Sequence, residues 1–412
     1  FPTRPLPILI DQQQLVLDFV LFNPEEIVVS GAYDLDALFI RLGEAIDRVG
    51  AKRVVLDTVE SLFSGLPNPA VLRAELRRLF IWLKDKGVTA ILTGESAVET
   101  LTREGLEEYV SDCVIKLDLR VENRLAARYL RIIKYRGSSF GSNEYPFIIT
   151  GRGCKLFPIT AGRLDVVVST EIVSTGVADL DAMFESGGYY RGSSILVSGA
   201  SGTGKSALLA SFTKAACQRG ERVLYFSFEE SPSQIIRNMG SMGLDLAQDV
   251  QAGRLVIDSA RSSQMGLELH LLRLQAAIES FQPCSVVIDP ITSLLDVGSA
   301  YEIKRTLDKL INLVKHKNIT LVLGSLTPPG VNPEFSTLPI ASIIDTWIVL
   351  AVVEGDGERN RALYIQKSRG MGHSNKVREF KITQHGIEVC DVFYGQSGVL
   401  VGRSRLIGVS QA

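Results

Sequence analysis

The sequence predicts an α/β protein built from two copies of one domain, each with a mostly parallel central sheet. Three observations predict this. Strand-like and helical patterns alternate from Leu15 onward, a glycine-rich motif lies between an apolar strand and a helix, and the chain repeats itself at a spacing of about 232 residues. Alternation of this kind joins parallel strands through helices, so a parallel sheet is expected in each copy.

Length and composition agree with two or three domains that each bury a core: the chain has 412 residues, 46% hydrophobic and 22% charged. The net charge is −2 and no basic stripe is present, which disfavours a strong nucleic-acid binder. The five scattered cysteines form no C-x-x-C pair. The sequence shows no signal peptide and no apolar run of membrane-spanning length, so we expect reduced thiols in a cytoplasmic protein.

The first copy begins with alternating elements. Apolar residues at helical spacing predict helices over residues 35–46 and 72–83. Residues 52–57 predict a buried strand that ends in a carboxylate, Asp57, and residues 88–92 predict a further strand.

The second copy repeats the first. Residues 51–63 resemble residues 283–295, and Arg136 and Arg369 lie 233 positions apart in matching contexts. We therefore expect tandem domains.

The repeat also sets the predicted boundaries: a first domain over 1–160, a linker over 161–171 and a second domain over 172–412. The same spacing would place the glycine-rich motif of the first copy about 33 residues before Phe1. We therefore expect a first domain that is N-terminally incomplete. Either an upstream part is missing or this copy is a broken one; the former is favoured because the remaining strands would lack their central neighbours.

The glycine-rich motif of the second copy has the sequence Gly-Ala-Ser-Gly-Thr-Gly-Lys-Ser and matches the P-loop pattern G-x-x-x-x-G-K-[ST]. Its backbone N–H groups would cradle a phosphate chain, with the lysine on the β- and γ-phosphates and the serine hydroxyl on Mg²⁺. The alternative is a chance glycine-rich turn. The residues expected to bind nucleotide are Gly199, Ser201, Gly202, Thr203, Gly204, Lys205 and Ser206.

Carboxylates follow two further strands of the second copy. The strand over residues 222–228 leads to Glu229 and Glu230, which would act as a metal-side partner and a general base. An ordinary charged turn is the alternative. The strand over residues 285–289 is a Walker B strand, whose Asp289 would hold the Mg²⁺ shell together with Ser206 and Glu229.

Basic side chains follow a late strand in both copies. Lys367 and Arg369 offer two fixed positive charges that would stabilise a transferring γ-phosphoryl group, and Lys134 and Arg136 repeat the arrangement. A solvated basic turn is the alternative interpretation.

Together these motifs resemble a known family. The P-loop, Glu229-Glu230-Ser231, Val287-Ile288-Asp289, Lys367-x-Arg369-Gly370 and Val377-Arg378-Glu379-Phe380 resemble the KaiC family of circadian-clock ATPases and autokinases, which have tandem RecA-like P-loop NTPase domains. The resemblance extends to residues 108–112 and 143–147 in the first copy.

The resemblance implies a double-ring homohexamer with ATP and Mg²⁺ between subunits, slow ATP hydrolysis in one ring and autophosphorylation in the other. It implies that Glu230 is the kinase base, with Glu229 assisting and Lys205 and Arg369 also catalytic. It also implies regulation by partners, of which a KaiB-like protein is one. Further nucleotide contacts, some of them reaching the neighbouring subunit's ATP, are implied for Arg361, Lys367, Ser368, Arg369 and His373.

The family's phosphoacceptors are two adjacent hydroxyl residues before an I-x-D-T stretch. Here residues 341–346 read Ala-Ser-Ile-Ile-Asp-Thr, so Ser342 is the one expected acceptor. The C-terminal tail, where a KaiA-like activator would bind, ends soon after residues 401–403. We therefore expect neither a two-site cycle nor dependence on such an activator. A buried serine at a strand start is the alternative for Ser342.

Two other functions remain open from the sequence. A RecA-like DNA-dependent ATPase would need basic loops facing a ring channel, which the near-neutral charge disfavours. A non-enzymatic signalling scaffold would use ATP mainly to hold subunits together.

Overall fold

A computed structural model describes residues 10, 12, 14–19, 36–58, 69–95, 111–122, 125–150, 153–156, 168–328, 340–355 and 358–391. The chain divides into two compact units: residues 1–120 with 128–157, and residues 121–127 with 158–412. Residues 161–167 of the expected linker, and the C-terminal tail after residue 391, lie outside the described residues.

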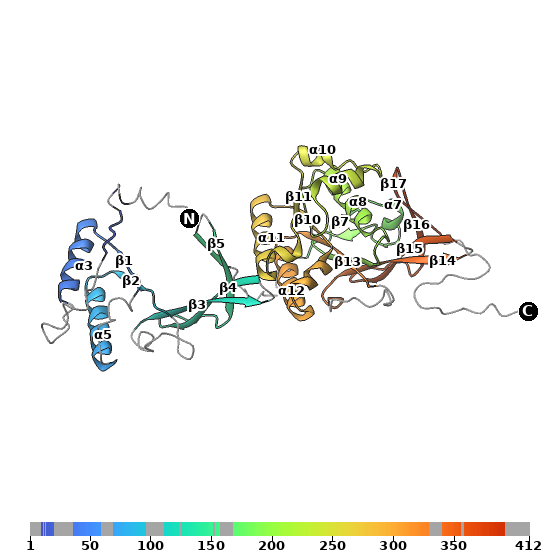
Figure 1. The fold of residues 1–412 in the computed structure, drawn as a ribbon. Helices are drawn as coiled ribbons and strands as arrows, with labels where there is room; N and C mark the ends of the chain where they lie inside the picture. Colours follow the sequence, from blue (N-terminus) through green and yellow to red (C-terminus); the bar gives the residue numbers. More distant parts are fainter. Residues whose placement is uncertain are drawn as a thin grey trace, which may run out of the picture. The chain divides into compact units, whose positions relative to one another are not determined.

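The first unit contains a small helix-and-sheet layer (Figure 1). Helices α3 (Asp36–Val49) and α5 (Pro69–Asp85) accompany the parallel strands β1 (Arg53–Leu56) and β2 (Thr89–Leu92), in agreement with the predicted order. Apolar residues recur every three or four positions on each helix, so one stripe of each faces the strands. The buried core consists of Leu38, Phe39, Leu56, Leu76, Leu79 and Leu83.

Residues 53–56 form the predicted strand, but the prediction that this strand is buried is wrong for one of its faces. Leu56 is 8% exposed and packs in the helical core, but Val55 is 60% exposed and Ile91 of β2 is 51% exposed. Successive side chains of a strand point to opposite faces, and within the described residues the helices α3 and α5 cover one face of this pair.

Most of a four-stranded sheet also belongs to the first unit. Its strands occur in the order β3 (Cys113–Glu122), β4 (Leu125–Tyr135), β5 (Glu144–Thr150) and β6 (Gly153–Leu156).

The second unit is built on a large sheet, with nine strands in the described part of the chain (Figure 1). The order is β11-β10-β12-β13-β9-β14-β15-β16-β17; all pairs from β11 to β14 are parallel and the last three pairs are antiparallel. The strands are β9 (Ser194–Gly199), β10 (Val223–Ser227), β11 (Leu255–Ser259), β12 (Ser285–Asp289), β13 (Thr320–Leu326), β14 (Thr346–Gly355), β15 (Glu358–Ser368), β16 (Arg378–Thr383) and β17 (Gly386–Asp391).

Helices cover both faces of this sheet. Tyr225 of β10 and Val287 of β12 pack in the core formed with α8 and α9, whereas Phe226 and Ile288 face α11 and α12. The remaining short elements are α7, α10, the 3₁₀ turns η1 and η2, and the pair β7–β8. Their bounds are α7 (Ala178–Asp181), α8 (Lys205–Gln218), α9 (Pro232–Gly240), α10 (Ala247–Gln251), α11 (Leu267–Phe281), α12 (Ala300–His316), η1 (Ser262–Gln264), η2 (Ile291–Asp296), β7 (Ile172–Val173) and β8 (Tyr189–Tyr190).

The repeat is visible in the structure. Elements α3, β1, α5, β2, β3 and β4 recur in the same order as α11, β12, α12, β13, β14 and β15. The turn after the late strand is also repeated: the Arg136 N–H donates to the Asp112 carbonyl at 3.0 Å, and the Arg369 N–H donates to the Asp345 carbonyl at 2.9 Å.

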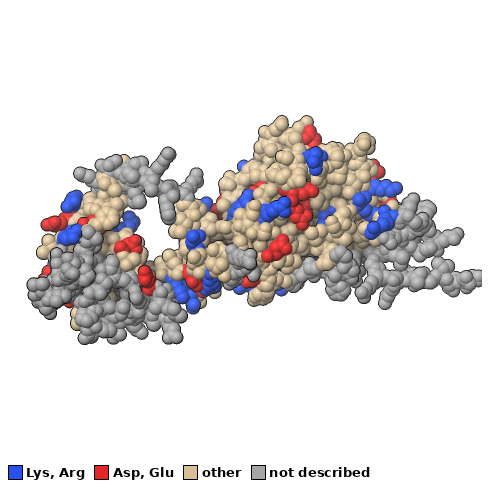
Figure 2. Space-filling view, in the orientation of Figure 1, with Lys and Arg blue, Asp and Glu red and all other residues tan. Residues whose placement is uncertain are grey.

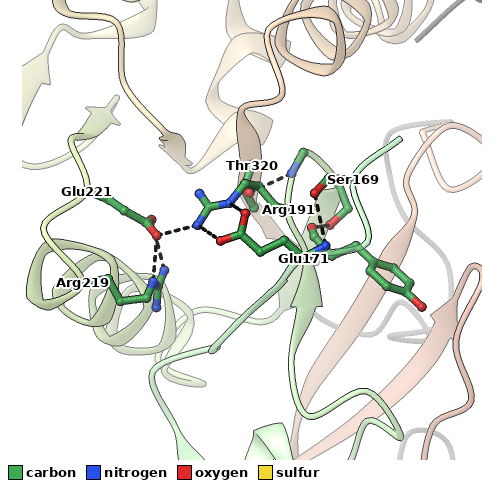
Figure 3. Close-up of polar contacts among 9 residues, drawn as sticks. Ser169, Glu171, Arg191, Arg219, Glu221 and Thr320 are labelled. Atoms are coloured by element: carbon green, nitrogen blue, oxygen red, sulfur yellow. Dashed lines mark hydrogen bonds and ion pairs between the residues drawn. The ribbon is translucent and has the colours of Figure 1, made fainter. Parts of the chain in front are cut away.

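An ion-pair cluster anchors the start of the second unit (Figure 3). The Arg191 guanidinium donates to both Glu171 carboxylate oxygens at 2.7 Å and to Glu221 Oε1 at 2.8 Å. Glu221 also accepts from Arg219 at 2.9 Å. This cluster joins the segment before β7 to the turn between α8 and β10.

Charged side chains of both signs are mixed on the face of the second unit in Figure 2, and no continuous basic stripe crosses the residues described there. Among the helices that the structure describes, none combines the length and apolar character needed to cross a membrane.

Candidate functional site

The P-loop connects the carboxyl end of β9 to the first turn of α8, as predicted. Gly202 and Gly204 have φ angles of 78° and 101°, a left-handed backbone that glycine adopts without a Cβ clash. Gly199 is needed for a different reason: a Cβ there would lie 2.5 Å from the Leu350 carbonyl oxygen. Thr203 is fully buried, and its hydroxyl closes the turn by donating to the Ala200 carbonyl at 2.8 Å.

Lys205 is buried at the base of this loop. Its Nζ donates to the carbonyls of Gly199 at 2.9 Å and Ala200 at 2.7 Å. Burial lowers the pKa of the amine, while the nearby carboxylates of Asp289 and Glu229 oppose the shift. The side chain is therefore held inside the loop, next to two acidic groups, and its contact with phosphate stays a prediction.

Asp289 is the last residue of β12 and lies at the carboxyl ends of the parallel strands. Asp289 is 8% exposed, and its carboxylate accepts a hydrogen bond from the Tyr225 hydroxyl at 3.0 Å. Burial raises the pKa of the Asp289 carboxyl, although the nearby Ser206 and Tyr225 side chains and the charge of Lys205 favour the carboxylate form. A serine hydroxyl beside one carboxylate fits Mg²⁺, which takes oxygen ligands and is usually shared with substrate phosphates.

Glu229 and Glu230 follow β10, as predicted, but their environments differ. Glu229 is exposed and accepts from the Ser293 hydroxyl at 3.3 Å. Glu230 is half-buried, and its carboxylate accepts from Asn238 Nδ2 at 3.2 Å. Its backbone is fixed at both ends: the N–H donates to the Ser227 hydroxyl at 3.0 Å, and the carbonyl accepts from the Ser259 hydroxyl at 2.9 Å. Glu230 is thus the more firmly held of the two carboxylates.

Arg361 lies on the same side of the sheet as the P-loop. Its Nε donates to the Gly202 carbonyl at 3.2 Å, so the guanidinium contacts the loop of its own chain. The resemblance grouped Arg361 with Lys367 and Arg369, but the structure separates it from them along β15.

The expected acceptor lies at the opposite sheet edge. Strand β14 runs parallel to β9, with Thr346 beside Ile195 and Leu350 beside Gly199. Ser342 precedes Thr346 and therefore lies at the amino ends of these strands, whereas the P-loop follows their carboxyl ends. The Ser342 side chain is exposed, which excludes the alternative of a buried serine at this strand start.

Two basic side chains hold the turn that contains Ser342. Lys367 Nζ donates to the carbonyls of Ala341 at 2.6 Å and Ile344 at 2.7 Å, and Arg369 donates to the Ser342 carbonyl. Burial lowers the pKa of Lys367, and the nearby Arg369 lowers it further. Within one chain, these cations therefore contact the acceptor turn.

The remaining predicted residues lie elsewhere. The Ser368 hydroxyl is 3.2 Å from the Thr346 hydroxyl, at the amino edge of the sheet. His373 forms an isolated bridge with Phe184. In the first unit, Arg136 forms an ion pair with Asp112 at 3.4 Å; Lys134 lies on β4.

Sequence reasoning missed several polar residues of the site. Tyr225 lies in a strand pattern that is otherwise apolar: its hydroxyl is the one polar side-chain group between Val223 and Phe226, and it is buried beside Asp289. Asn238 and Ser259 gave no local signal, because their link to Glu230 depends on how α9 and β11 pack.

Comparisons with known proteins cover almost the whole chain. The family model "ATPase: KaiC" matches residues 9–161 and 173–392. "Circadian clock protein KaiC2" of Synechocystis sp. is 48% identical over 400 residues, 97% of this chain and 70% of that protein. "Circadian clock oscillator protein KaiC" of Acaryochloris marina is 36% identical over 97% of this chain and 78% of its own length, and "Circadian clock protein KaiC3" of Synechocystis sp. is 35% identical over 91% and 75%.

Proposed function

Since this chain belongs to the KaiC family of ATPases with tandem RecA-like domains, we propose that it uses ATP both for hydrolysis and for phosphorylation of its own Ser342. The proposed assembly is a homohexamer in which ATP and Mg²⁺ lie between subunits. Clock-like timing or signalling is the role proposed from the names of its relatives. A KaiB-like partner is proposed from the motifs that resemble the KaiC family.

The observation that supports transfer between subunits is the separation of donor and acceptor on one sheet. Four residue steps along β14, from Thr346 to Leu350, separate the two edges by about 13 Å at about 3.3 Å per residue. Ser342 lies four residues further from the P-loop edge. In-line phosphoryl transfer requires near contact between the attacking oxygen and the γ-phosphorus, so a neighbouring subunit's acceptor fits this geometry better than the chain's own.

The proposed chemistry assigns one task to each group. Bound Mg²⁺ would neutralise charge on the phosphates, and Ser206 and Asp289 are the residues that would hold it. Lys205 would turn from its loop carbonyls to the β- and γ-phosphates. Glu230 would accept the proton of water, or of the neighbour's Ser342 hydroxyl, as the new oxygen–phosphorus bond forms and the bond to ADP breaks.

Lys367 and Arg369 are proposed to act on both the acceptor turn and the transferring phosphoryl group. Their present contacts hold the Ser342 turn of their own chain. In the ring they would present this turn to the neighbouring subunit's ATP and stabilise the transferring phosphoryl group, as fixed cations do in other phosphoryl transfers.

The test is the intact mass of the protein before and after incubation with Mg-ATP, measured beside Ser342→Ala and together with ADP release. One added phosphate that Ser342→Ala lacks supports the proposal. Release of ADP without any added phosphate would leave an ATPase and refute the autokinase. An added phosphate that persists in Ser342→Ala would move the acceptor to another residue.

A further inference from the structure

The segment that ends at Asp345 carries the proposed acceptor, and this carboxylate links three elements. Asp345 Oδ2 accepts from the Ser194 N–H at 2.9 Å and from the Ser194 hydroxyl at 2.7 Å. In return, the Asp345 N–H donates to the Ser194 carbonyl at 3.0 Å. The start of β14 is thereby fixed to the start of β9, the strand whose other end is the P-loop.

Lys315, in the last turn of α12, completes this arrangement. Its Nζ lies 2.9 Å from Asp345 Oδ1 and 2.8 Å from Oδ2. The Lys315 and Asp345 side chains are 26% and 18% exposed, so the pair is partly shielded from solvent and salt. Burial alone would raise the pKa of Asp345, but the bonds from Lys315 and Ser194 outweigh it and lower the pKa, which keeps the carboxylate charged.

These contacts hold the end of the acceptor turn at Asp345, while Lys367 and Arg369 hold the carbonyls within it. Inside the turn, the Ile343 N–H donates to the Ile340 carbonyl at 3.0 Å and the Ile344 N–H to the same carbonyl at 3.3 Å. The backbone around Ser342 is therefore held at several points, although its side chain is exposed. A fixed backbone with an exposed hydroxyl is what phosphoryl transfer from an external donor to that hydroxyl requires.

We propose that Lys315 is a positioning residue for phosphorylation of Ser342, which acts through Asp345 by fixing the acceptor turn to β9. The inference rests on the proposed autokinase function. It assigns no contact between Lys315 and nucleotide: α12 ends at the amino edge of the sheet, because β13, which follows it, begins beside Ser194. Removing Lys315 should therefore affect the acceptor and leave the hydrolytic site unchanged.

The experiment compares Lys315→Met, Lys315→Arg and Lys317→Met in the full chain with Mg-ATP. Lys317→Met makes the same charge change at an exposed position two residues away. We expect Lys315→Met to slow Ser342 phosphorylation at saturating ATP by about 10- to 100-fold, the scale of a misplaced reacting group. ADP release and the ATP concentration at half-maximal rate should not change. Lys315→Arg should recover most of the rate, and Lys317→Met should match the parent.

A second readout is independent of catalysis. Hydrogen exchange at the amides of Ile343 and Ile344 should be faster in Lys315→Met than in the parent, with exchange in the P-loop unchanged. Equal phosphorylation rates in Lys315→Met and the parent would overturn the inference while the autokinase stands. A parallel loss of ADP release and phosphorylation would also overturn it, because that is the result of general destabilisation. A parent protein that gains no phosphate would refute the autokinase itself, and the positioning role with it.

Discussion

Replacement of Gly199 by alanine tests whether the packing between the P-loop and β14 sets nucleotide affinity. The new Cβ would lie 2.5 Å from the Leu350 carbonyl oxygen and 2.8 Å from the Thr203 hydroxyl oxygen. Contacts under 3.0 Å are essentially not tolerated, so the loop or the strand must move by at least about 0.5 Å. Overpacking of this kind costs about 1–3 kcal/mol. If the loop moves, the cost weakens ATP binding by about 5- to 140-fold, at 1.4 kcal/mol per tenfold.

The assay is calorimetric titration of ATP with Mg²⁺, together with the melting temperature of each protein. Gly240→Ala is the matched control: nothing lies within 4 Å of its Cβ, and it is exposed at the end of α9. Since alanine is a better helix former, this control should bind ATP normally and melt at the same or a higher temperature. ATP affinity in Gly199→Ala equal to that of the parent would refute the reasoning, whether or not its melting temperature falls.

Two further predictions concern Glu230 and His270. Glu230→Gln keeps the shape and the acceptor oxygen for Asn238, so it should spare ATP binding and slow ADP release and Ser342 phosphorylation by about 10²- to 10⁴-fold; unchanged rates would remove it as the base. Burial lowers the pKa of His270, which contacts the Ser262 carbonyl at 2.9 Å. The unfolded state then binds the proton of His270 more tightly than the folded state does. The stability contributed by keeping His270 neutral is therefore fully present above a pH of about 6.5, and it is lost as the pH falls towards the lowered pKa. The melting temperature should therefore fall less between pH 7 and pH 5.5 in His270→Gln than in the parent. An equal fall in melting temperature in both proteins would contradict the lowered pKa of His270.

Sequence patterns predicted well those elements whose signal lies within a short stretch of consecutive residues. The strand–loop–helix around Lys205, the strand ending at Asp289 and the tandem repeat were all read from the sequence and are present in the structure. The burial of residues 52–57 was predicted wrongly, because an apolar run does not show whether one or both faces of a strand are covered. Val55 is exposed for this reason.

The positions of Arg361 and Ser342 depend on pairing between strands that are far apart in the sequence, which local patterns do not predict. The contact of Arg361 with the Gly202 carbonyl depends on which part of β15 lies beside the P-loop. The position of Ser342 at the far edge depends on the pairing of β14 with β9 across about 150 residues of sequence. Neither pairing has a local signature, and the same holds for the Lys315–Asp345 contact.

Transfer between subunits is the central claim, and mixing two variants that are each deficient in Ser342 phosphorylation tests it most directly. Glu230→Gln chains carry the acceptor but lack the proposed base, and Ser342→Ala chains carry the base but lack the acceptor. After assembly of the mixture with Mg-ATP, intact mass resolves the two chains. We predict phosphate on the Glu230→Gln chains in the mixture, at a rate far above that of Glu230→Gln alone. A mixture that gains no phosphate, under conditions where the parent is phosphorylated, would contradict transfer between subunits.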